Sequence, residues 1–174
     1  EGIHYYDEKV IPVLRRRAEA VHRHGAVCVG QVLHLGNSIQ HAGALRLAMA
    51  PSPVPDEFDI EVPHELEVEE IAELVQVFAH GARRVKEAGL DGVEIHAAHG
   101  YLINQFLSPH ANRRNDQYGG NPDKRLQILL EILDATRELV GPSFPIGVRI
   151  AGEEFRQGGL ALKEVKQIAQ RLND

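Results

Sequence analysis

Cysteine, excess basic charge and long apolar runs are all missing or scarce in this sequence of 174 residues. The single cysteine, Cys28, excludes an internal disulfide framework and any cysteine-cluster metal site. No uninterrupted apolar stretch approaches the length needed to cross a bilayer, which argues against an integral membrane protein. Acidic residues outnumber basic ones by 25 to 19, and the basic residues are scattered, so a basic face for nucleic acid is not expected.

Several enzyme motifs are absent as well. The sequence has no Walker loop, no nucleotide-binding glycine fingerprint and no nucleophile elbow, so those classes have no support. Its composition, 43 % hydrophobic and 25 % charged, is that of a folded chain with one sizeable core. The chain starts without methionine or a targeting peptide and ends inside a helical pattern. We therefore expect a piece of a larger cytoplasmic protein, called the full-length protein below.

Helical and strand-like patterns alternate along the chain. Apolar residues at helical spacing predict four helices, and short apolar runs between them predict three strands. The helices are expected at about residues 6–24, 64–88, 121–140 and from 161 onward, and the strands at 26–33, 92–96 and 145–150. Gly25, Gly89 and Gly141 stand where left-handed C-terminal caps are expected, and Asn121 stands where an N-cap is expected. This alternation indicates parallel βαβ units.

The two faces of the predicted strands decide between a doubly wound sheet and a barrel. Val93 and Ile95 share one face of their strand, whereas Glu94 and His96 share the other. One apolar face and one face that turns polar at the carboxyl end suit a barrel strand whose inner face opens onto a site. We predict the α/β class and a partial (β/α)8 TIM barrel with three strand–helix units and a leading helix. Residues 1–174 would form the central part of one barrel domain, truncated at both ends.

Two long segments follow the first and second strands, where the barrel would carry its site. The stretch 36–63 holds four prolines and is expected to be an irregular loop with a functional role. His34 and His41 lie in or beside it, with no spacing that selects a role. The stretch 97–120 is the densest polar cluster. Within it, Arg114 and Asp116 are expected to brace the loop by a charge-assisted hydrogen bond.

His96, His99 and Tyr101 are the leading catalytic candidates because they lie within six residues at the end of the second strand. Imidazole can donate hydrogen bonds to an oxygen that gains negative charge, and a phenol can deliver a proton. The simpler interpretation is that they are surface loop residues, since the chain has ten histidines. A zinc site using Glu94 with the two histidines is a third interpretation, although no further acidic cluster accompanies it.

Gln31 and Arg149 end the first and third strands and are the leading binding candidates. An arginine on the inner face of an apolar strand calls for an anionic or acceptor-rich partner, which could equally be a carboxylate such as Glu94. An amide can read the edge of a heterocycle, although structural hydrogen bonding is equally common for glutamine. If the strands are neighbours, Gln31, His96 and Arg149 converge on one flat ring.

Residues 92–109 (GVEIHAAHGYLINQFLSP) and 112–120 (NRRNDQYGG) resemble the signature of the Old Yellow Enzyme family of flavin-dependent ene-reductases. The segments 31–36 (QVLHLG) and 147–149 (GVR) recur in the family's order and spacing, so the resemblance spans essentially the whole chain. One departure is Asn37, where many members of the family carry an arginine.

The resemblance implies FMN as cofactor and NAD(P)H as reductant. Gln31 and Arg149 would contact the isoalloxazine ring, and His96 and His99 would hold the carbonyl oxygen of an enone or enoate. Tyr101 would protonate the α-carbon after flavin N5 delivers hydride to the β-carbon. The implied partner is this small molecule, with neither nucleic acid nor membrane involved and with homo-oligomer formation left open. The metal-assisted hydrolase using Glu94, His96 and His99 remains the alternative.

The family's phosphate anchor lies outside this chain. Three strands alone would leave open sheet edges and an unfinished barrel interior. We therefore expect the isolated chain to bind FMN poorly and to be an inactive barrel fragment, whatever the full-length protein does.

Overall fold

The computed structural model describes residues 5–38, 47–56 and 61–173. The chain divides into two compact units, each built from three segments. Unit 1 comprises residues 1–32, 72–95 and 131–148, and unit 2 comprises residues 33–71, 96–130 and 149–174. The two units are described separately.

The described helices and strands alternate as expected. The helices are α1 (Val10–His22), α2 (Val68–Glu87), α3 (Leu102–Leu107), α4 (Pro122–Val140) and α5 (Leu162–Arg171). The strands are β1 (Val29–Val32), β2 (Met49–Ala50), β3 (His64–Glu65), β4 (Gly92–Ala97) and β5 (Ile146–Ile150). All four predicted helices and all three predicted strands are present. The six-residue helix α3 and the two-residue strands β2 and β3 were not predicted.

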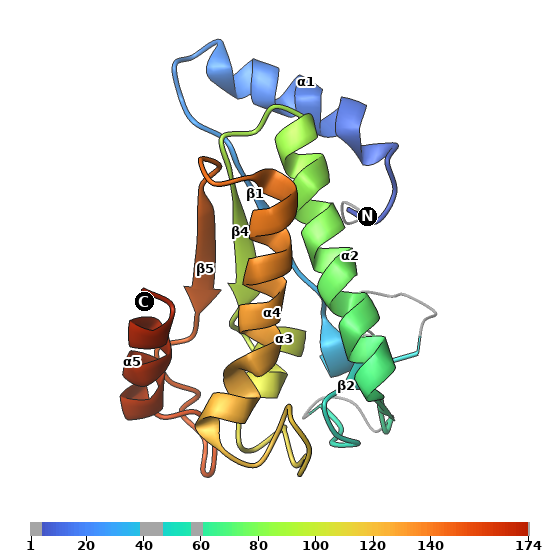
Figure 1. The fold of residues 1–174 in the computed structure, drawn as a ribbon, viewed down its shortest axis with the longest axis vertical. Helices are drawn as coiled ribbons and strands as arrows, with labels where there is room; N and C mark the ends of the chain where they lie inside the picture. Colours follow the sequence, from blue (N-terminus) through green and yellow to red (C-terminus); the bar gives the residue numbers. More distant parts are fainter. Residues whose placement is uncertain (1–4, 39–46, 57–60, 174) are drawn as a thin grey trace. The chain divides into compact units, whose positions relative to one another are not determined.

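Unit 1 contains the body of a three-stranded sheet in the order β1-β4-β5. Strands β1 and β4 are parallel, with Val29 opposite Gly92 and Val32 opposite Ile95. Figure 1 shows β4 between the other two strands, with the arrows of β4 and β5 pointing the same way. The parallel βαβ connection that the alternation predicts is therefore present.

The two faces of this sheet differ in burial. Val93 and Ile95 are fully buried, whereas Val29, on the face that also carries Gln31, is 56 % exposed. On the buried side, a Cβ on Gly30 would lie 2.8 Å from the Val85 side chain, so only glycine lets α2 approach β1 this closely. One apolar face against helices and one open face is the arrangement that the strand patterns predict.

The helices of unit 1 pack side by side through both apolar and polar contacts. Lys86 Nζ on α2 donates to the carbonyl of Val140 at 2.8 Å, which joins the ends of α2 and α4. Gly141 ends α4 with φ 77°, as its predicted role as a cap requires. The buried residues of α1 are Val10, Leu14 and Ala18, whereas Val13 is 36 % exposed.

Unit 2 is held together by arginine side chains that bind backbone carbonyls. Arg114 is paired with Asp116, Nη2 to Oδ2 at 2.6 Å, as the sequence predicts. Its Nη1 also donates to the carbonyls of Pro51 at 2.9 Å and Leu66 at 2.6 Å. The stretch 36–63 is therefore not wholly irregular, since β2 pairs with β3 beside this arginine. Across the described ranges of both units, no helix combines the length and apolar character of a membrane span.

Asp91 gives unit 1 a pH-dependent contact. Its Oδ2 accepts hydrogen bonds from the Cys28 backbone N–H at 2.6 Å and from His22 Nε2 at 2.8 Å. The Cys28 amide first, and then His22, lower the pKa of Asp91 below its ordinary value of 3.8. A lowered carboxyl pKa in the folded state stabilises the fold above the unfolded-state pKa, and this stabilisation is lost as the pH falls through the folded-state pKa.

We therefore expect the stability of the full-length protein to fall more steeply below about pH 4 in the wild type than in Asp91→Asn. The measurement is the free energy of unfolding from urea titrations at a series of pH values. The side-chain amide of Asp91→Asn can still accept the hydrogen bond of the Cys28 N–H, but it does not titrate. The difference between the two proteins therefore measures the effect of the carboxylate charge. Parallel pH profiles for the two proteins would contradict this prediction.

Candidate active site

The three catalytic candidates lie at the end of β4 and on the turn that follows it. His96 is the fifth residue of β4 and is 3 % exposed. His99 and Gly100 both have left-handed backbone, with φ 61° and 73°. The Tyr101 N–H donates to the carbonyl of Ala98 at 3.2 Å, and α3 starts at the next residue. This turn returns the chain so that all three rings face one another, with the ring centroids of His96 and Tyr101 5.3 Å apart.

A chain of hydrogen bonds fixes which nitrogen of each histidine carries its proton. The Ala98 backbone N–H donates to His96 Nδ1 at 3.1 Å, so this nitrogen must be the acceptor. The proton of a neutral His96 is then on Nε2, which lies 3.0 Å from His99 Nδ1. His99 Nδ1 accepts that proton's hydrogen bond, and the N–H of a neutral His99 is on Nε2. We call this pair a relay: His96 donates to His99, and the pair leaves one N–H, that of His99 Nε2, available to a ligand.

That both histidines hold the same oxygen of a substrate stays a prediction. In the structure, the Nε2 of His96 is directed at His99. His99 is exposed, and its Nε2 has no hydrogen-bond partner among the described residues. The hydroxyl of Tyr101 likewise has no partner in the described part of the chain, and its ring centroid is 6.4 Å from that of His99. Two donors on neighbouring rings, the His99 N–H and the Tyr101 O–H, therefore have no hydrogen-bond partner among the described residues.

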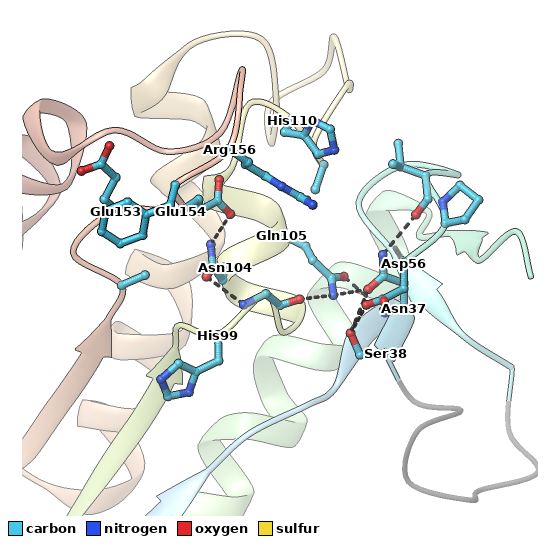
Figure 2. A pocket seen from close by; sticks show the side chains of 16 residues that line it. Asn37, Ser38, Asp56, His99, Asn104, Gln105, His110, Glu153, Glu154 and Arg156 are labelled. Atoms are coloured by element: carbon cyan, nitrogen blue, oxygen red, sulfur yellow. Dashed lines mark hydrogen bonds between the residues drawn. The ribbon is translucent and has the colours of Figure 1, made fainter. Parts of the chain in front are cut away.

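Buried amides on α3 hold the turn in place. Asn104 Oδ1 accepts the Gly100 N–H at 3.0 Å, and Gln105 Nε2 donates to the Gly100 carbonyl at 2.6 Å. Gln105 also donates to Asn37 Oδ1 at 2.6 Å. Figure 2 shows this row of contacts leading from Asn104 through Gln105 to Asn37. Asn37, which replaces an arginine of the family, thus serves here as a buried acceptor.

A pocket of about 450 Å³ adjoins the turn within unit 2. His99 lies at one end of it, and Asn37, Ser38 and Asp56 lie at the other (Figure 2). The wall opposite α3 comes from the loop after β5. The lining residues from that loop are Ala151, Glu153, Glu154, Phe155 and Arg156. The pocket is therefore an open cleft with the exposed His99 ring at one end.

The predicted binding residues Gln31 and Arg149 lie on strands β1 and β5. Gln31 Nε2 donates to Glu94 Oε1 at 2.6 Å within unit 1, so the amide is engaged by a carboxylate. Arg149 lies in β5 and is exposed, rather than enclosed as an inward residue, because β5 has one neighbouring strand in this sheet. The convergence of Gln31, His96 and Arg149 on one ring stays a prediction.

The donor set of these two residues fits an isoalloxazine edge. A guanidinium supplies only donors and an amide supplies a donor and an acceptor, which suits an edge rich in carbonyl oxygens and ring nitrogens. Gly147 precedes Arg149 by two residues, and a Cβ there would meet only the Val93 carbonyl oxygen at 3.9 Å. That stretch of β5 therefore offers bare backbone to a flat ring.

The structure gives no support to the zinc-site interpretation. Among the residues that the structure describes, no group of three histidine, cysteine, aspartate or glutamate side chains could hold a metal ion. Glu94, His96 and His99, the ligands that the alternative needs, are engaged as described above. Of the two further histidines, His34 Nδ1 accepts the Gly36 N–H at 3.1 Å, and His41 lies outside the described residues.

Comparison with known proteins decides the family. The model of the NADH:flavin oxidoreductase / NADH oxidase family matches residues 1–174. The chain belongs to this family. The resemblance to Old Yellow Enzyme is thereby confirmed, and so is the expectation of FMN with NAD(P)H as reductant at the level of the family. The prediction that this chain is part of a TIM barrel is confirmed as well.

Individual members show how much of such a protein this chain represents. It is 46 % identical to a metal reductase of Desulforamulus reducens, covering 95 % of this chain and 25 % of that protein. It is 42 % identical to an NADPH dehydrogenase of a Geobacillus species, and the match covers 97 % of this chain and 48 % of that protein. The structure of Old Yellow Enzyme from a Pichia species aligns with a TM-score of 0.81 at 27 % identity. This alignment covers 97 % of this chain and 47 % of that protein. The chain thus spans about a quarter to a half of these relatives.

Sequence reasoning missed the residues that support the turn. Asn104 and Gln105 are 1 % and 3 % exposed, inside a helix whose six residues are all buried. The available signal is the polar pair within the apolar run at residues 102–107, because amides in a buried helix need hydrogen-bond partners. Glu154 was missed for another reason. Its partners lie about fifty positions away in the sequence, and no local pattern indicates them.

Proposed function

We propose that the full-length protein is an FMN-dependent NAD(P)H oxidoreductase that reduces C=C bonds activated by a carbonyl, with Tyr101 as the proton donor. The observation that carries this proposal is the His96–His99 relay, which leaves the His99 Nε2–H available while the Tyr101 ring lies 6.4 Å from the His99 ring, centroid to centroid. Two adjacent donors of different acidity suit a substrate that takes up negative charge on an oxygen and a proton on a nearby carbon.

Each residue has a separate task in this reaction. His99 donates Nε2–H to the carbonyl oxygen of an enone or enoate, where negative charge develops. His96 donates to His99 Nδ1 and so keeps that N–H on the outer nitrogen, while hydrogen bonds in series strengthen one another. Tyr101 delivers its proton to the α-carbon.

Both electrons of the proposed reduction would come from the cofactor. FMN, when bound, supplies the hydride that reaches the β-carbon. Gln31 and Arg149 would hold its ring, with the guanidinium placed to stabilise negative charge on the reduced cofactor. The protein's own contribution is therefore placement, charge stabilisation and one proton.

The test replaces the donor nitrogen. In the FMN-loaded full-length protein, His99→Ala should lower the rate of enone reduction by about 10²- to 10³-fold, because it removes the donor to the developing oxyanion. His99→Asn should retain part of the activity, since its amide can still donate. The measurement is stopped-flow oxidation of the reduced flavin by 2-cyclohexenone.

The control is His80→Asn, a change at an exposed position of α2, which should leave this rate unchanged. A His99→Ala protein as fast as the wild type would contradict the role given to the relay. A wild type that NADPH or NADH reduces, but that cyclohexenone does not reoxidise, would overturn the proposed reaction itself.

A further inference from the structure

Glu154 lies in the loop after β5, and its carboxylate accepts three hydrogen bonds. Its Oε1 accepts from Asn104 Nδ2 at 3.0 Å, and its Oε2 accepts from Ser108 Oγ at 2.7 Å and from the Leu160 backbone N–H. The Glu154 N–H donates to the Leu160 carbonyl at 3.0 Å, which closes the loop on itself. A Cβ on Gly159 would lie 2.7 Å from this Oε2 and 3.0 Å from the Glu154 Cβ, so a larger residue there would displace the carboxylate. The carboxylate is therefore held in place from several sides.

Asn104 joins this carboxylate to the turn that carries His99. Its Nδ2 donates to Glu154, and its Oδ1 accepts the Gly100 N–H at 3.0 Å (Figure 2). Both contacts require the same orientation of the buried amide, because a carboxylate oxygen accepts and a backbone N–H donates. The side of Asn104 that faces the turn is thus determined by what Glu154 accepts on the other side.

The backbone that Asn104 supports is an unfavourable one for His99. A left-handed φ, here 61°, costs a non-glycine residue about 1 kcal/mol or more and persists only where neighbouring contacts impose it. The hydrogen bond from the Gly100 N–H to Asn104 holds the residue that follows His99. This turn also places His99 Nδ1 3.0 Å from His96 Nε2. A change that releases Gly100 from Asn104 would therefore act on the His96–His99 relay.

We propose that Glu154 is a positioning residue of the site. Its carboxylate orients the Asn104 amide, the amide holds the turn at Gly100, and the turn holds His99 in the relay. The proposal deepens the proposed function and rests on it, because His99 is the donor named there.

The proposal requires a group at position 154 that accepts on both sides. An amide there would direct its NH₂ either at Asn104 Nδ2 or at the Leu160 N–H, and a donor would face a donor in either case. Facing Asn104 leaves the closed loop 154–160 intact, so Asn104 is the residue that gives up a hydrogen bond. It then loses its contact either with Glu154 or with Gly100.

Two substitutions that exchange the amide and the carboxylate test this in the FMN-loaded full-length protein. Glu154→Gln sets an amide against the Asn104 amide, and Asn104→Asp sets a carboxylate against the Glu154 carboxylate, so each alone should break the contact. In the double variant the new amide donates to the new carboxylate, which still accepts the Gly100 N–H. The carbonyl oxygen of the new amide still accepts the Leu160 N–H. The matched control is Glu138→Gln, at an exposed position of α4.

One measurement follows the relay and the other follows the reaction. The first is the ¹⁵N–¹⁵N scalar coupling across the hydrogen bond from His96 Nε2–H to His99 Nδ1, in protein labelled with ¹⁵N-histidine. It should be present in the wild type, the control and the double variant, and absent from both single variants. The second is the stopped-flow rate of flavin oxidation by 2-cyclohexenone. It should fall by about 10- to 10²-fold in each single variant and return to within about threefold of the wild type in the double variant.

The outcomes separate this proposal from the proposed function. If cyclohexenone reoxidises the wild type, and Glu154→Gln changes neither the coupling nor the rate, only the role of Glu154 is overturned. A loss in Glu154→Gln that the double variant does not restore also overturns that role, because the loss then does not pass through Asn104. If Glu154→Gln does not fold, a folded double variant with the coupling supports the proposal, and an unfolded one overturns it. If cyclohexenone does not reoxidise the wild type but the coupling responds as expected, only the proposed reaction is overturned.

Discussion

Tyr101→Phe should lower the rate at which an enone reoxidises the reduced full-length protein by about 10²- to 10⁴-fold, the usual contribution of a general acid. The substitution removes only the hydroxyl, which has no partner among the described residues. It keeps the ring that packs 5.3 Å from His96 and 6.4 Å from His99, centroid to centroid. The fold and the histidine relay should therefore be unaffected.

Measuring flavin reduction and flavin reoxidation separately distinguishes the loss of a proton donor from general damage to the site. Reduction of the flavin by NADPH or NADH takes no proton from Tyr101, so its rate should stay within about twofold of the wild type. Both rates can be measured by anaerobic stopped-flow absorbance. Tyr6→Phe is the matched control, since Tyr6 is 51 % exposed and lies in a different unit. Unchanged enone reduction in Tyr101→Phe would rule out this residue as the proton donor.

Arg114→Met should lower the free energy of unfolding by about 3 kcal/mol, the lower end of what breaking a buried ion pair costs. The Arg114 side chain is 6 % exposed, whereas that of Asp116 is 30 % exposed, and water therefore compensates part of the loss. The variant leaves the Pro51 and Leu66 carbonyls without their donor. It also removes the hydrogen bond that is the main cause of the lowered pKa of Asp116.

The neighbouring residue supplies the control for this experiment. Arg113 is exposed, and its hydrogen bond to Ser52 Oγ comes from the backbone N–H, which the substitution keeps. Arg113→Met should therefore change stability by less than about 0.5 kcal/mol. The free energies come from urea denaturation of the full-length proteins. In Arg114→Met, Asp116→Asn should recover part of the loss because the Asp116 carboxylate is then no longer left without its cation. Equal stabilities of the two arginine variants would contradict the bracing role.

The order of helices and strands was predictable because it depends on local signals. Apolar periodicity located four helices and three strands. Gly25, Gly89 and Gly141 do adopt the left-handed backbone expected of helix caps, and the side chain of Asn121 accepts the Lys124 N–H at 3.0 Å. Each of these features involves residues within a few positions of one another. Helix α3 was not predicted because its six residues are all buried and show no amphipathic period.

The candidate residues of the site could be named from the sequence, but their arrangement could not. The spacing of His96, His99 and Tyr101 identified the candidates, and the family signature gave them roles. Spacing could not indicate that His96 would donate to His99, because that depends on the Ala98 amide and on the left-handed backbone of His99. Nor could it indicate the tie between Asn104 and Glu154, which are fifty positions apart.

By itself, then, the amino-acid sequence determined the α/β class, the parallel order of elements, the catalytic candidates and the family. Apolar period, capping residues and a contiguous motif are all properties of neighbouring residues. Only the tertiary structure decided which histidine nitrogen carries the available proton, that Gln31 bonds to Glu94 and that Asn104 ties Glu154 to the His99 turn. The first depends on the backbone conformation of the turn at residues 96–99. The other two depend on hydrogen bonds between residues fifty or more positions apart, and those contacts exist only once the backbone has folded.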